Sequence, residues 1–534
     1  MTAMSAPKKW TTPPGPRGLL CHPPLEQWEA VAAANRTVLD GMAFDVAGLP
    51  AAELRRSARR RVLAMAGIGG RAEEGLIIVT GHQPQFYHPG VWIKAFAVAA
   101  AARRPGVAGL NVAVDHDAGE LAAEVPWRPA DGAARLAWSK EFLVPPVGGR
   151  PLETLPAPSR DEAESFLQKL VSRVETLGWP EGAARLRLFG EALRAAVREA
   201  RSAAEVGLLA RQRYEAAFGE TLVPDVPVSR ISGTPEFLRF FVHWAFHAGE
   251  LRRCYNAALA DYRRRHRVRS RANPFPDLLE RPDQGVELPF WGLTPSGVRR
   301  KLYARRTADG IVLTHLEGEF ARLPATGGDA AVEALLEAGV QVRPRAVPLT
   351  VFHRLFVADL FIHGTGGGAY DEVTDAFIGE AFGVPAPAYG VVSATLYLPL
   401  GERPVQSGAL RALRRKLRDL RFNPQRFAWE LGKLSAELAE LLRRKEELID
   451  AIQQAPRGVG PGPSPKRVLT REIEQVNEAL YRALGPVEEA ARAQLAELEA
   501  KAAAGAVATR RTYPFFLYDP AELWDLLGVG RGEA

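Results

Sequence analysis

Cysteine, methionine and long apolar runs are all scarce in this chain of 534 residues. The two cysteines, Cys21 and Cys254, are too few for a disulfide framework or a four-thiolate zinc site. No apolar run reaches the roughly 18 residues that a membrane-spanning helix needs, and the segment 1–16 lacks the apolar stretch of a secretory signal. We therefore expect a soluble, cytoplasmic protein with no membrane partner.

A large excess of either charge sign is also missing. Lys and Arg total 69 and Asp and Glu total 62, which gives a formal net charge of +7. Nucleic-acid-binding proteins usually carry a stronger basic excess for their length, so we expect no nucleic-acid partner. The contents of 47% hydrophobic and 25% charged residues are typical of a folded globular protein, and the length predicts several domains.

The hydrophobic pattern predicts an α/β fold with a parallel sheet. Residues 75–80 and 109–114 have the composition of short buried strands, and residues 91–102 between them that of an apolar helix. Such a strand–helix–strand sequence is a βαβ unit, which implies parallel strands joined by a right-handed crossover. A strand predicted over 355–363, followed by a helix over 369–382, extends the same alternation.

Helical patterns interrupt and follow this core. Residues 159–218 are largely helical by pattern, and residues 235–269 predict one long amphipathic helix. Residues 411–454 and 467–504 alternate charge with Leu and Ala at helical spacing, with a Pro/Gly-rich stretch between them, which predicts an antiparallel coiled-coil hairpin. The apolar tail 513–518 is expected to return to the core as a strand or extended segment.

These patterns divide the chain into segments. We expect an irregular and helical N-terminal segment over 1–70 and a core over 71–400 with helical and connecting insertions over about 126–340. A coiled-coil hairpin is expected over 405–508, and a C-terminal tail that packs on the core over 509–534.

The first candidate for chemistry is the loop 80–90, between a predicted strand and a predicted helix. In open α/β sheets, ligands bind beyond the carboxyl ends of the strands, where His82, Gln83 and His88 offer hydrogen-bond donors and acceptors. Lys94, one turn into the helix, reinforces the preference of a helix N-terminus for anions. The alternative is a structural loop whose histidines cap backbone groups.

The second candidate is Asp115-His116-Asp117, followed by Glu120, at the end of the next predicted strand. Two carboxylates beside an imidazole can hold a metal, orient a general base or bind an amine. The spacing matches no standard zinc motif, so we assign no metal ligands. The alternative is a solvated charged turn, which the apolar strand before it disfavours.

The third candidate is the glycine-rich turn that follows residues 355–363. The amides of Gly364, Gly366 and Gly367 can cradle a phosphate or a carboxylate, although the turn lacks the Gly-Lys-Ser/Thr ending of a P-loop. A purely structural turn is an equal alternative. The basic cluster 263–271, with Arg267 at its centre, can meet an anionic ligand or can complement the C-terminal end of a helix.

The joint order of these motifs resembles the bacillithiol-biosynthesis cysteine-adding enzyme family, BshC. That family has an early Gly-Gln/His-Gln-Pro loop followed by Gly and Lys, a strand that ends in Asp-His-Asp before an acid, a later glycine-rich turn before a helix, a Phe-Gly-Val-Pro-x-Pro segment, and a charged coiled-coil hairpin. The resemblance covers residues 75–400, and the architecture agrees to about residue 520. The corresponding segments here are Gly81–Pro84 with Gly90 and Lys94, Asp115–Asp117 with Glu120, Gly364–Tyr370, and Phe382–Pro387.

The chain also departs from the family at the predicted pocket. His82 stands where the family more often has Gln, and Val114 stands where an acid usually precedes Asp-His-Asp. The late turn contains Gly366-Gly-Gly-Ala instead of Gly-Pro-Gly-Glu. The resemblance is therefore that of a divergent member, whose substrate need not be that of the family.

The resemblance implies a Rossmann-like core and a coiled coil that pairs two subunits as a homodimer. It implies a ligase that joins an amino acid, cysteine in the family, to the amine of an amino sugar, a malate-linked glucosamine. Activation of the carboxylate needs an energy source, for which ATP or another nucleotide is the expected cofactor. The expected catalytic residues are Asp115, His116, Asp117 and His82, and the expected substrate-binding residues are Gln83, His88, Lys94, Glu120, Gly364, Gly366, Gly367, Tyr370 and Arg267.

A non-catalytic protein is the alternative from a different class. In that hypothesis the coiled coil is the working part of an assembly protein, and the α/β core senses a ligand. This hypothesis is favoured over the ligase if the pure protein binds no nucleotide, amino sugar or thiol in calorimetry, and if pull-downs instead return a protein partner held through residues 411–504.

Overall fold

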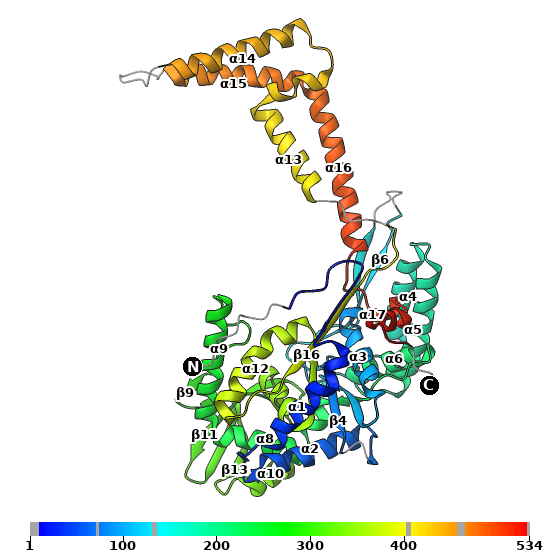
Figure 1. Cartoon of the computed structure of the whole chain (residues 1–534), viewed down its shortest axis with the longest axis vertical. Helices are drawn as coiled ribbons and strands as arrows, with labels where there is room; N and C mark the ends of the chain where they lie inside the picture. Colours follow the sequence, from blue (N-terminus) through cyan, green and yellow to red (C-terminus); the bar gives the residue numbers. More distant parts are fainter. Residues whose placement is uncertain (1–9, 71–73, 131–135, 402–406, 456–464, 531–534) are drawn as a thin grey trace. The chain divides into compact units, whose positions relative to one another are not determined.

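The structure is a computed structural model, and the chain divides into two compact units that are described separately (Figure 1). We call the first the core unit and the second the helical unit. The core unit comprises residues 1–127, 138–398 and 511–534, and the helical unit comprises 128–137 and 399–510. The residues that the structure describes are 10–70, 74–130, 136–401, 407–455 and 465–530.

A six-stranded sheet forms the centre of the core unit. All neighbouring strands are parallel except the edge strand β1, which pairs antiparallel with β16 and comes from an N-terminal segment expected to be irregular. In spatial order the strands are β1 (Arg17–His22), β16 (Tyr389–Leu396), β15 (Leu360–His363), β4 (Leu76–His82), β5 (Val107–Ala113) and β8 (Asp225–Pro227). The mixed α/β fold with a parallel sheet is thus confirmed.

The predicted βαβ unit is present as β4, α3 (Pro89–Ala102) and β5, and β4 and β5 pair in parallel. The helix α3 packs on β4, β5 and β16 and is apolar on nearly all sides, because the tail of the chain covers its other face. Trp92 and Phe96 of α3 are fully buried, with Phe515 and Trp524 of that tail against their rings. Burial on both faces explains why the strands have continuous apolar runs.

A second, antiparallel sheet belongs to the same unit. It is built from hairpins, and its strand β10 pairs with β14, the strand that leads back toward the parallel sheet. Its strands are β9 (Glu280–Arg281), β10 (Gly285–Leu293), β11 (Arg299–Thr307), β12 (Gly310–His315), β13 (Gly318–Pro324) and β14 (Val342–Pro344).

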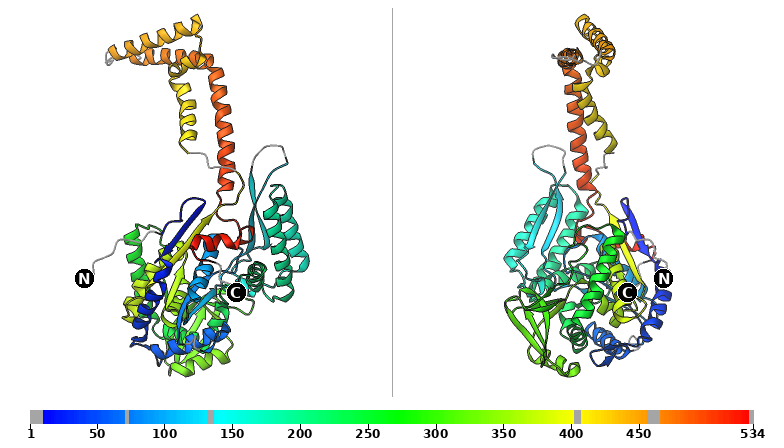
Figure 2. Two further views of the ribbon diagram at one scale, coloured as in Figure 1. Left: turned by 45° about the vertical axis from the view of Figure 1, so that its right-hand side comes forward. Right: turned by 90° about the vertical axis from the view of Figure 1, so that its left-hand side faces the viewer.

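Helices and short strands complete the core unit, and α4, α5 and α6 lie side by side as a group (Figure 2). Ser159 begins this group with a capping box, in which its side chain and that of Glu162 each accept from the other's backbone amide. The elements are η1 (Leu25–Gln27), α1 (Trp28–Asp40), β2 (Asp45–Val46), β3 (Leu49–Pro50), α2 (Ala51–Met65), β6 (Leu121–Trp127), β7 (Ala137–Val144), η3 (Leu152–Thr154), α4 (Arg160–Glu175), α5 (Pro180–Glu199), α6 (Ala203–Ala217), α7 (Val228–Ser232), α10 (Gly328–Glu337) and α17 (Pro520–Leu527).

The prediction of a single helix over 235–269 is wrong. Two helices, α8 (Pro235–Phe246) and α9 (Ala248–His266), meet at His247, whose backbone leaves the helical region. Buried apolar residues continue at helical spacing from α8 through α9, so the hydrophobic pattern carries no sign of the break.

The prediction of a strand over 355–363 is also wrong in its first half. Residues 355–357 belong to a π-helical turn, η4 (His353–Val357), which continues α11 (Ala346–Phe352). Of the predicted strand, only the last four residues, β15, form a strand. The run is buried on all sides, and periodicity does not distinguish a short buried strand from a buried helix. The glycine-rich turn after β15 is already helical, since α12 (Thr365–Phe382) begins directly behind Gly364.

The C-terminal tail packs on the core as expected, although it is not a strand. Tyr513 and Phe515 to Tyr518 are buried, and the centre of the tail is a short 3-10 turn, η6 (Phe515–Leu517). The ring of Phe516 stacks on Phe189 of α5 with 3.8 Å between centroids. The tail therefore fills an aromatic cluster between α3 and α5.

The helical unit contains more breaks than the sequence pattern predicts. Pro424 begins a 3-10 segment, and Gly485-Pro486 begins a new helix, so each expected long helix is divided. The helix α14 packs on α15, and α13 packs on α16 around Leu420, Leu484, Val487 and Ala491. The elements are α13 (Ser407–Phe422), η5 (Pro424–Leu431), α14 (Ala436–Gln454), α15 (Pro465–Ala483) and α16 (Gly485–Ala508). Residues 456–464 of the expected hairpin tip lie outside the described residues.

Among the helices that the structure describes, none combines the length and the apolar character needed to cross a bilayer.

Candidate functional site

A cavity of about 640 Å³ lies at the carboxyl ends of the parallel strands β4, β5 and β15 in the core unit. The three stretches selected from the sequence all contribute to its wall, through Gly81–Gln83, His116–Asp117 and His363–Gly367. Parallel strands that end at one edge of a sheet bring their following loops together there. We call this cavity the core pocket.

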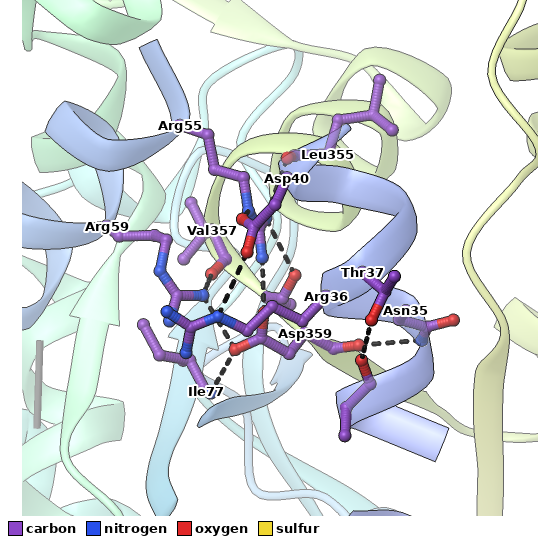
Figure 3. A network of polar contacts seen from close by, with 12 residues as sticks. Asn35, Arg36, Thr37, Asp40, Arg55, Arg59, Ile77, Leu355, Val357 and Asp359 are labelled. Atoms are coloured by element: carbon purple, nitrogen blue, oxygen red, sulfur yellow. Dashed lines mark hydrogen bonds and ion pairs between the residues drawn. The ribbon is translucent and has the colours of Figure 1, made fainter. Parts of the chain in front are cut away.

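The start of β15, which carries one of these stretches, is fixed by a buried ionic cluster. The carboxylate of Asp359 accepts hydrogen bonds from Arg55, from Arg59 at 2.8 Å and from the amide of Ile77 at 2.7 Å. Figure 3 shows both arginines of α2 pointing toward this carboxylate. Because the acid and both guanidinium groups are almost inaccessible to water, the cluster locks α2, β4 and β15 together.

The histidines of the first loop line the core pocket and are uncharged. Burial and the neighbouring Lys94 lower the pKa of His82 to about 3, and the His82 Nδ1 lies 3.1 Å from the carbonyl of Gln83. Burial and Arg511 lower the pKa of His88 to about 4. His88 also caps α3, since its Nδ1 accepts from the amide of Gly90 at 3.0 Å. The capping alternative therefore describes His88 well, although its ring also borders the pocket.

Lys94 is a buried amine in the wall of the pocket. Lys94 lies in the second turn of α3, and its Nζ donates to the carbonyl of Gly81 at 2.6 Å. Burial lowers the pKa of Lys94 to about 7, because the charged form loses its hydration inside the protein. Lys94 therefore exchanges its proton close to neutral pH.

Only part of the Asp-His-Asp stretch faces the pocket. Asp115 points elsewhere, so its position does not support the catalytic role expected for it. The carboxylate of Asp115 accepts from the amide of Ser229 at 2.9 Å and from the Ser229 hydroxyl, and it does not line the cavity. Burial, then the nearby Glu153, raises the pKa of Asp115 to about 6. Asp115 is thus a buried anchor between β5 and α7.

Asp117 and His116 do face the cavity. Asp117 accepts from Arg299 at 2.8 Å and from the Gln83 amide at 3.2 Å. Burial pushes the pKa of Asp117 upward, but these bonds outweigh it and hold the pKa below its ordinary value. Burial lowers the pKa of His116 to about 3, so its Nε2–H donates to the carbonyl of Pro344 at 2.9 Å. Its buried Nδ1 accepts from no group within the described residues.

Three further residues expected to bind substrate lie outside the core pocket. Glu120 pairs with Lys140, and the side chain of Tyr370 is exposed beside Phe275. Arg267 is exposed at the left-handed end of α9. Its basic cluster is neutralised locally, for example by the ion pair of Arg265 with Glu372 at 2.6 Å, which favours the helix-end alternative.

The glycine-rich turn forms the open N-terminus of α12 in the pocket wall. Gly364 caps this helix of 18 residues without a side-chain hydrogen bond. Gly364 and Gly366 line the cavity, and a methyl group added to either would meet open space, so no side chain covers this first turn. Such a turn attracts an anion through its amides and through the helix dipole.

Sequence reasoning missed a basic wall of the pocket. Arg345 lies with its guanidinium 4.2 Å from the ring centre of Trp291, and Arg299 lies 5.1 Å from the same ring. Arg511 donates to the carbonyl of Ala394 at 3.0 Å from the tail of the chain. None of these residues belongs to a recognisable motif, and only the fold brings them to the ends of the parallel strands.

The charge of the lining is strongly one-sided. Among the described residues that line the pocket, Lys94 and three arginines face a single carboxylate, that of Asp117. Such a surface attracts a ligand with more than one negative charge. The basic residues are Lys94, Arg299, Arg345 and Arg511.

No family model matches the sequence, and no curated protein matches it either. Within the described residues there is also no group of three or more His, Cys, Asp and Glu side chains arranged to hold a metal ion.

Proposed function

We propose that this protein is a cytoplasmic ligase that joins an activated amino-acid carboxylate to the amine of an anionic amino sugar. The sequence resemblance to the cysteine-adding enzymes of bacillithiol synthesis suggests cysteine and a malate-linked glucosamine as the substrates. One observation carries the proposal: parts of three of the motifs behind that resemblance, Gly81–Gln83, His116–Asp117 and Gly364–Gly367, meet in one cavity whose lining holds four basic side chains and one acid. The parallel sheet would then be a Rossmann-like core.

The basic wall fits the carboxylates of such a substrate. Arg345 is bonded through Nη1 to the buried Glu287 at 2.8 Å, while its Nε and Nη2 have no partner within the described residues. Buried N–H groups without an acceptor carry a free-energy cost that a carboxylate or phosphate oxygen would remove. The open turn of α12 offers a second anion position.

Asp117 gives the site its attraction for an amine. Its side chain is the most exposed of the acids near the cavity, at 42%, and it stays charged because its pKa is lowered. A substrate ammonium would be drawn to this carboxylate while its anionic part lies on the arginines. This pairing of opposite charges suits a molecule that carries both an amine and carboxylates.

Amide formation from a free carboxylate also needs activation by a phosphoryl or adenylyl group. ATP would supply that group, and the residues present fit its charge, since the guanidinium groups of Arg345 and Arg511 both border the cavity. What these residues contribute is the binding and orientation of phosphate oxygens.

The direct test incubates the purified full chain with cysteine, malate-linked glucosamine and ATP. Mass spectrometry of the mixture is expected to show the amide product and a matching amount of ADP or AMP. Arg345→Met should reduce product formation at least tenfold. Absence of product, together with absence of heat on titration of malate-linked glucosamine, would overturn the proposal.

For the helical unit we propose pairing of two copies of the chain, as the resemblance implies. Trp429 and Phe422 are exposed at 74% and 62%, which is unusual for large aromatic side chains. Light scattering should show a dimer that Trp429→Ala weakens. The same exposed aromatics favour the alternative of an assembly protein, which would bind another protein through this unit and form no amide product.

A further inference from the structure

An imidazole–carboxylate pair at the end of β15 belongs to none of the roles given so far. The Nε2 atom of His363 lies 2.9 Å from Oδ2 of Asp371, one turn and a half into α12. Both side chains are more than nine-tenths buried, yet the ring of His363 borders the core pocket. The pair therefore joins the interior of the core unit to its cavity.

The carboxylate of this pair is held firmly in its charged form. Arg354, from the π-helical turn, donates to Asp371 at 2.7 Å and is itself fully buried. Burial alone would raise the pKa of Asp371, but Arg354 and His363 together lower it to about 2. Asp371 is thus an acceptor at any neutral pH, and it cannot donate a proton to the imidazole.

A charged acceptor at Nε2 fixes the tautomer of His363. The Nε2–H donates to Asp371, so the lone pair of the neutral ring resides on Nδ1. The ring plane is set by its neighbours, with Phe361 at 4.7 Å and Tyr389 at 5.3 Å between ring centres. The groups that face the imidazole are therefore Asp371 from α12, Arg354 from η4 and Tyr389 from β16.

The unprotonated nitrogen points toward the first turn of α12. A methyl group built on Gly367 would lie 2.8 Å from Nδ1 of His363, whereas Gly364 and Gly366 beside it face open space. The basic nitrogen and the free amides of the turn are thus neighbours in the pocket wall. A base next to amides that attract negative charge is the arrangement that acyl transfer requires.

We propose that His363 is the general base for attack of the amine, that Asp371 positions it, and that the amides of Thr365 to Gly367 hold the developing oxyanion. The proposal rests on the proposed ligase function, and it names the residues that perform its bond-forming step. Arg354 is a second positioning residue, which acts through Asp371.

The step balances with an activated acyl donor, a mixed anhydride of the amino acid with a phosphate. The amine nitrogen attacks the acyl carbon, a C–N bond forms, and the carbonyl electron pair moves to the oxygen at the α12 amides. His363 Nδ1 takes the proton that the amine loses. The intermediate then collapses, the bond from carbon to the phosphate oxygen breaks, and the imidazolium returns the proton to the departing phosphate or to water.

The tautomer is tested without any substrate. Nitrogen-15 histidine labelling of the full chain, with the His363 resonances identified by their loss in His363→Gln, should show a proton on Nε2 and none on Nδ1. Asp371→Asn should shift the proton distribution toward Nδ1. A ring protonated on Nδ1, or an unchanged tautomer in the Asp371 variant, would contradict the dyad.

The catalytic role is tested in the ligation assay. His363→Gln is expected to lower kcat by about 10²-fold or more, with little change in KM. Asp371→Asn should lower kcat by a smaller factor, in step with the change of tautomer seen by NMR. Asp375→Asn is the matched control, because Asp375 is the other carboxylate on Arg354 and lies at a more exposed position, with its side chain at 35%.

A glycine pair on the same helix gives an independent check. Gly367→Ala should crowd Nδ1 and lower kcat by about tenfold, whereas Gly379→Ala, which meets no atoms within 4 Å, should leave kcat unchanged. Full turnover in His363→Gln would overturn the general-base role while leaving the ligase intact. A wild-type chain that forms no amide would overturn the ligase and the acyl-transfer role together, and the NMR result would still decide whether the dyad exists.

Discussion

Arg299 on β11 donates a hydrogen bond of 2.8 Å to Asp117, the acid that follows β5, and so ties the antiparallel sheet to the edge of the parallel one. The same guanidinium donates to the carbonyl of His116 at 3.2 Å. The second sheet is therefore part of the pocket, since it carries the basic groups that the parallel sheet lacks. Asp117 enters the pocket already paired, whereas Asp115, two residues earlier, turns to Ser229.

The two aspartates should therefore respond differently to the same change. Asp117→Asn is expected to lower kcat/KM for the amino sugar by about tenfold or more, because Asp117 is the only carboxylate among the described residues that line the pocket. Asp115→Asn should keep kcat/KM within about twofold. Steady-state kinetics of both variants checks this, and equal losses in the two would contradict the division of the stretch.

Asp115 should instead affect the pH dependence of stability. Its folded pKa of about 6 lies above the unfolded value of about 3.9, so the folded state keeps a proton that the unfolded state has lost. The stabilising contribution is complete below pH 4 and is lost as the pH rises through 6. Relative to Asp115→Asn, the wild type should lose about 2–3 kcal/mol of stability over that window. Thermal unfolding of both proteins from pH 4 to 7 measures the difference.

The buried amine of Lys94 predicts a pH-dependent affinity for anions. Lys94 is charged below its pKa of about 7 and neutral above it, whereas His82, His88 and His116 remain neutral from pH 6 to 8. Malate should therefore bind about tenfold more tightly at pH 6 than at pH 8, a difference of about 1.4 kcal/mol. Calorimetry at the two pH values checks this, and Lys94→Met should bind equally at both. A persisting difference in that variant would assign the effect to another group.

The three stretches that line the pocket could be selected from the sequence because each is marked by a local pattern. Strands β4 and β5 are apolar runs that end in polar loops, and parallel pairing places those ends at one edge. Side-chain direction could not be predicted in the same way. Asp115 and Asp117 have the same chemistry and nearly the same place in the chain, and only the position of Ser229, over a hundred residues later, separates their roles.

The missed residues depend on contacts between distant segments. Arg345 and Trp291 meet because β10 pairs with β14, and Arg511 arrives with the returning tail. No periodicity or motif records such pairings. The His363–Asp371 bond was hidden for a related reason, since the turn between the two residues is helical and not the open loop that its glycines indicated.

Arg345, which lies between β14 and α11, should contribute more to anion affinity than Arg300 of the antiparallel sheet. The buried Glu287 orients it, and its Nε and Nη2 atoms remain without a partner within the described residues. Arg345→Met is expected to weaken malate binding by about 10- to 100-fold. Arg300→Met is the control, because Arg300 lies on β11 but pairs with Glu317 at the surface. Equal affinities of the two variants for malate would remove Arg345 from the site.

Asp359 should be the most sensitive ionic position of the fold. Its carboxylate is completely buried between Arg55 and Arg59, and Asp359→Asn would leave both guanidinium groups without a buried charge partner, with only the exposed Asp40 remaining, 4.0 Å from Arg55. Removal of one member of such a cluster costs about 3–5 kcal/mol. The melting temperature should fall by several degrees, and kcat should fall with it at temperatures where β15 loosens, because β15 carries His363. Asp40→Asn is the control, since Asp40 is 62% exposed and surface ion pairs contribute less than about 1 kcal/mol. An Asp359 variant as stable as the Asp40 variant would show that the arginines are satisfied by backbone carbonyls alone.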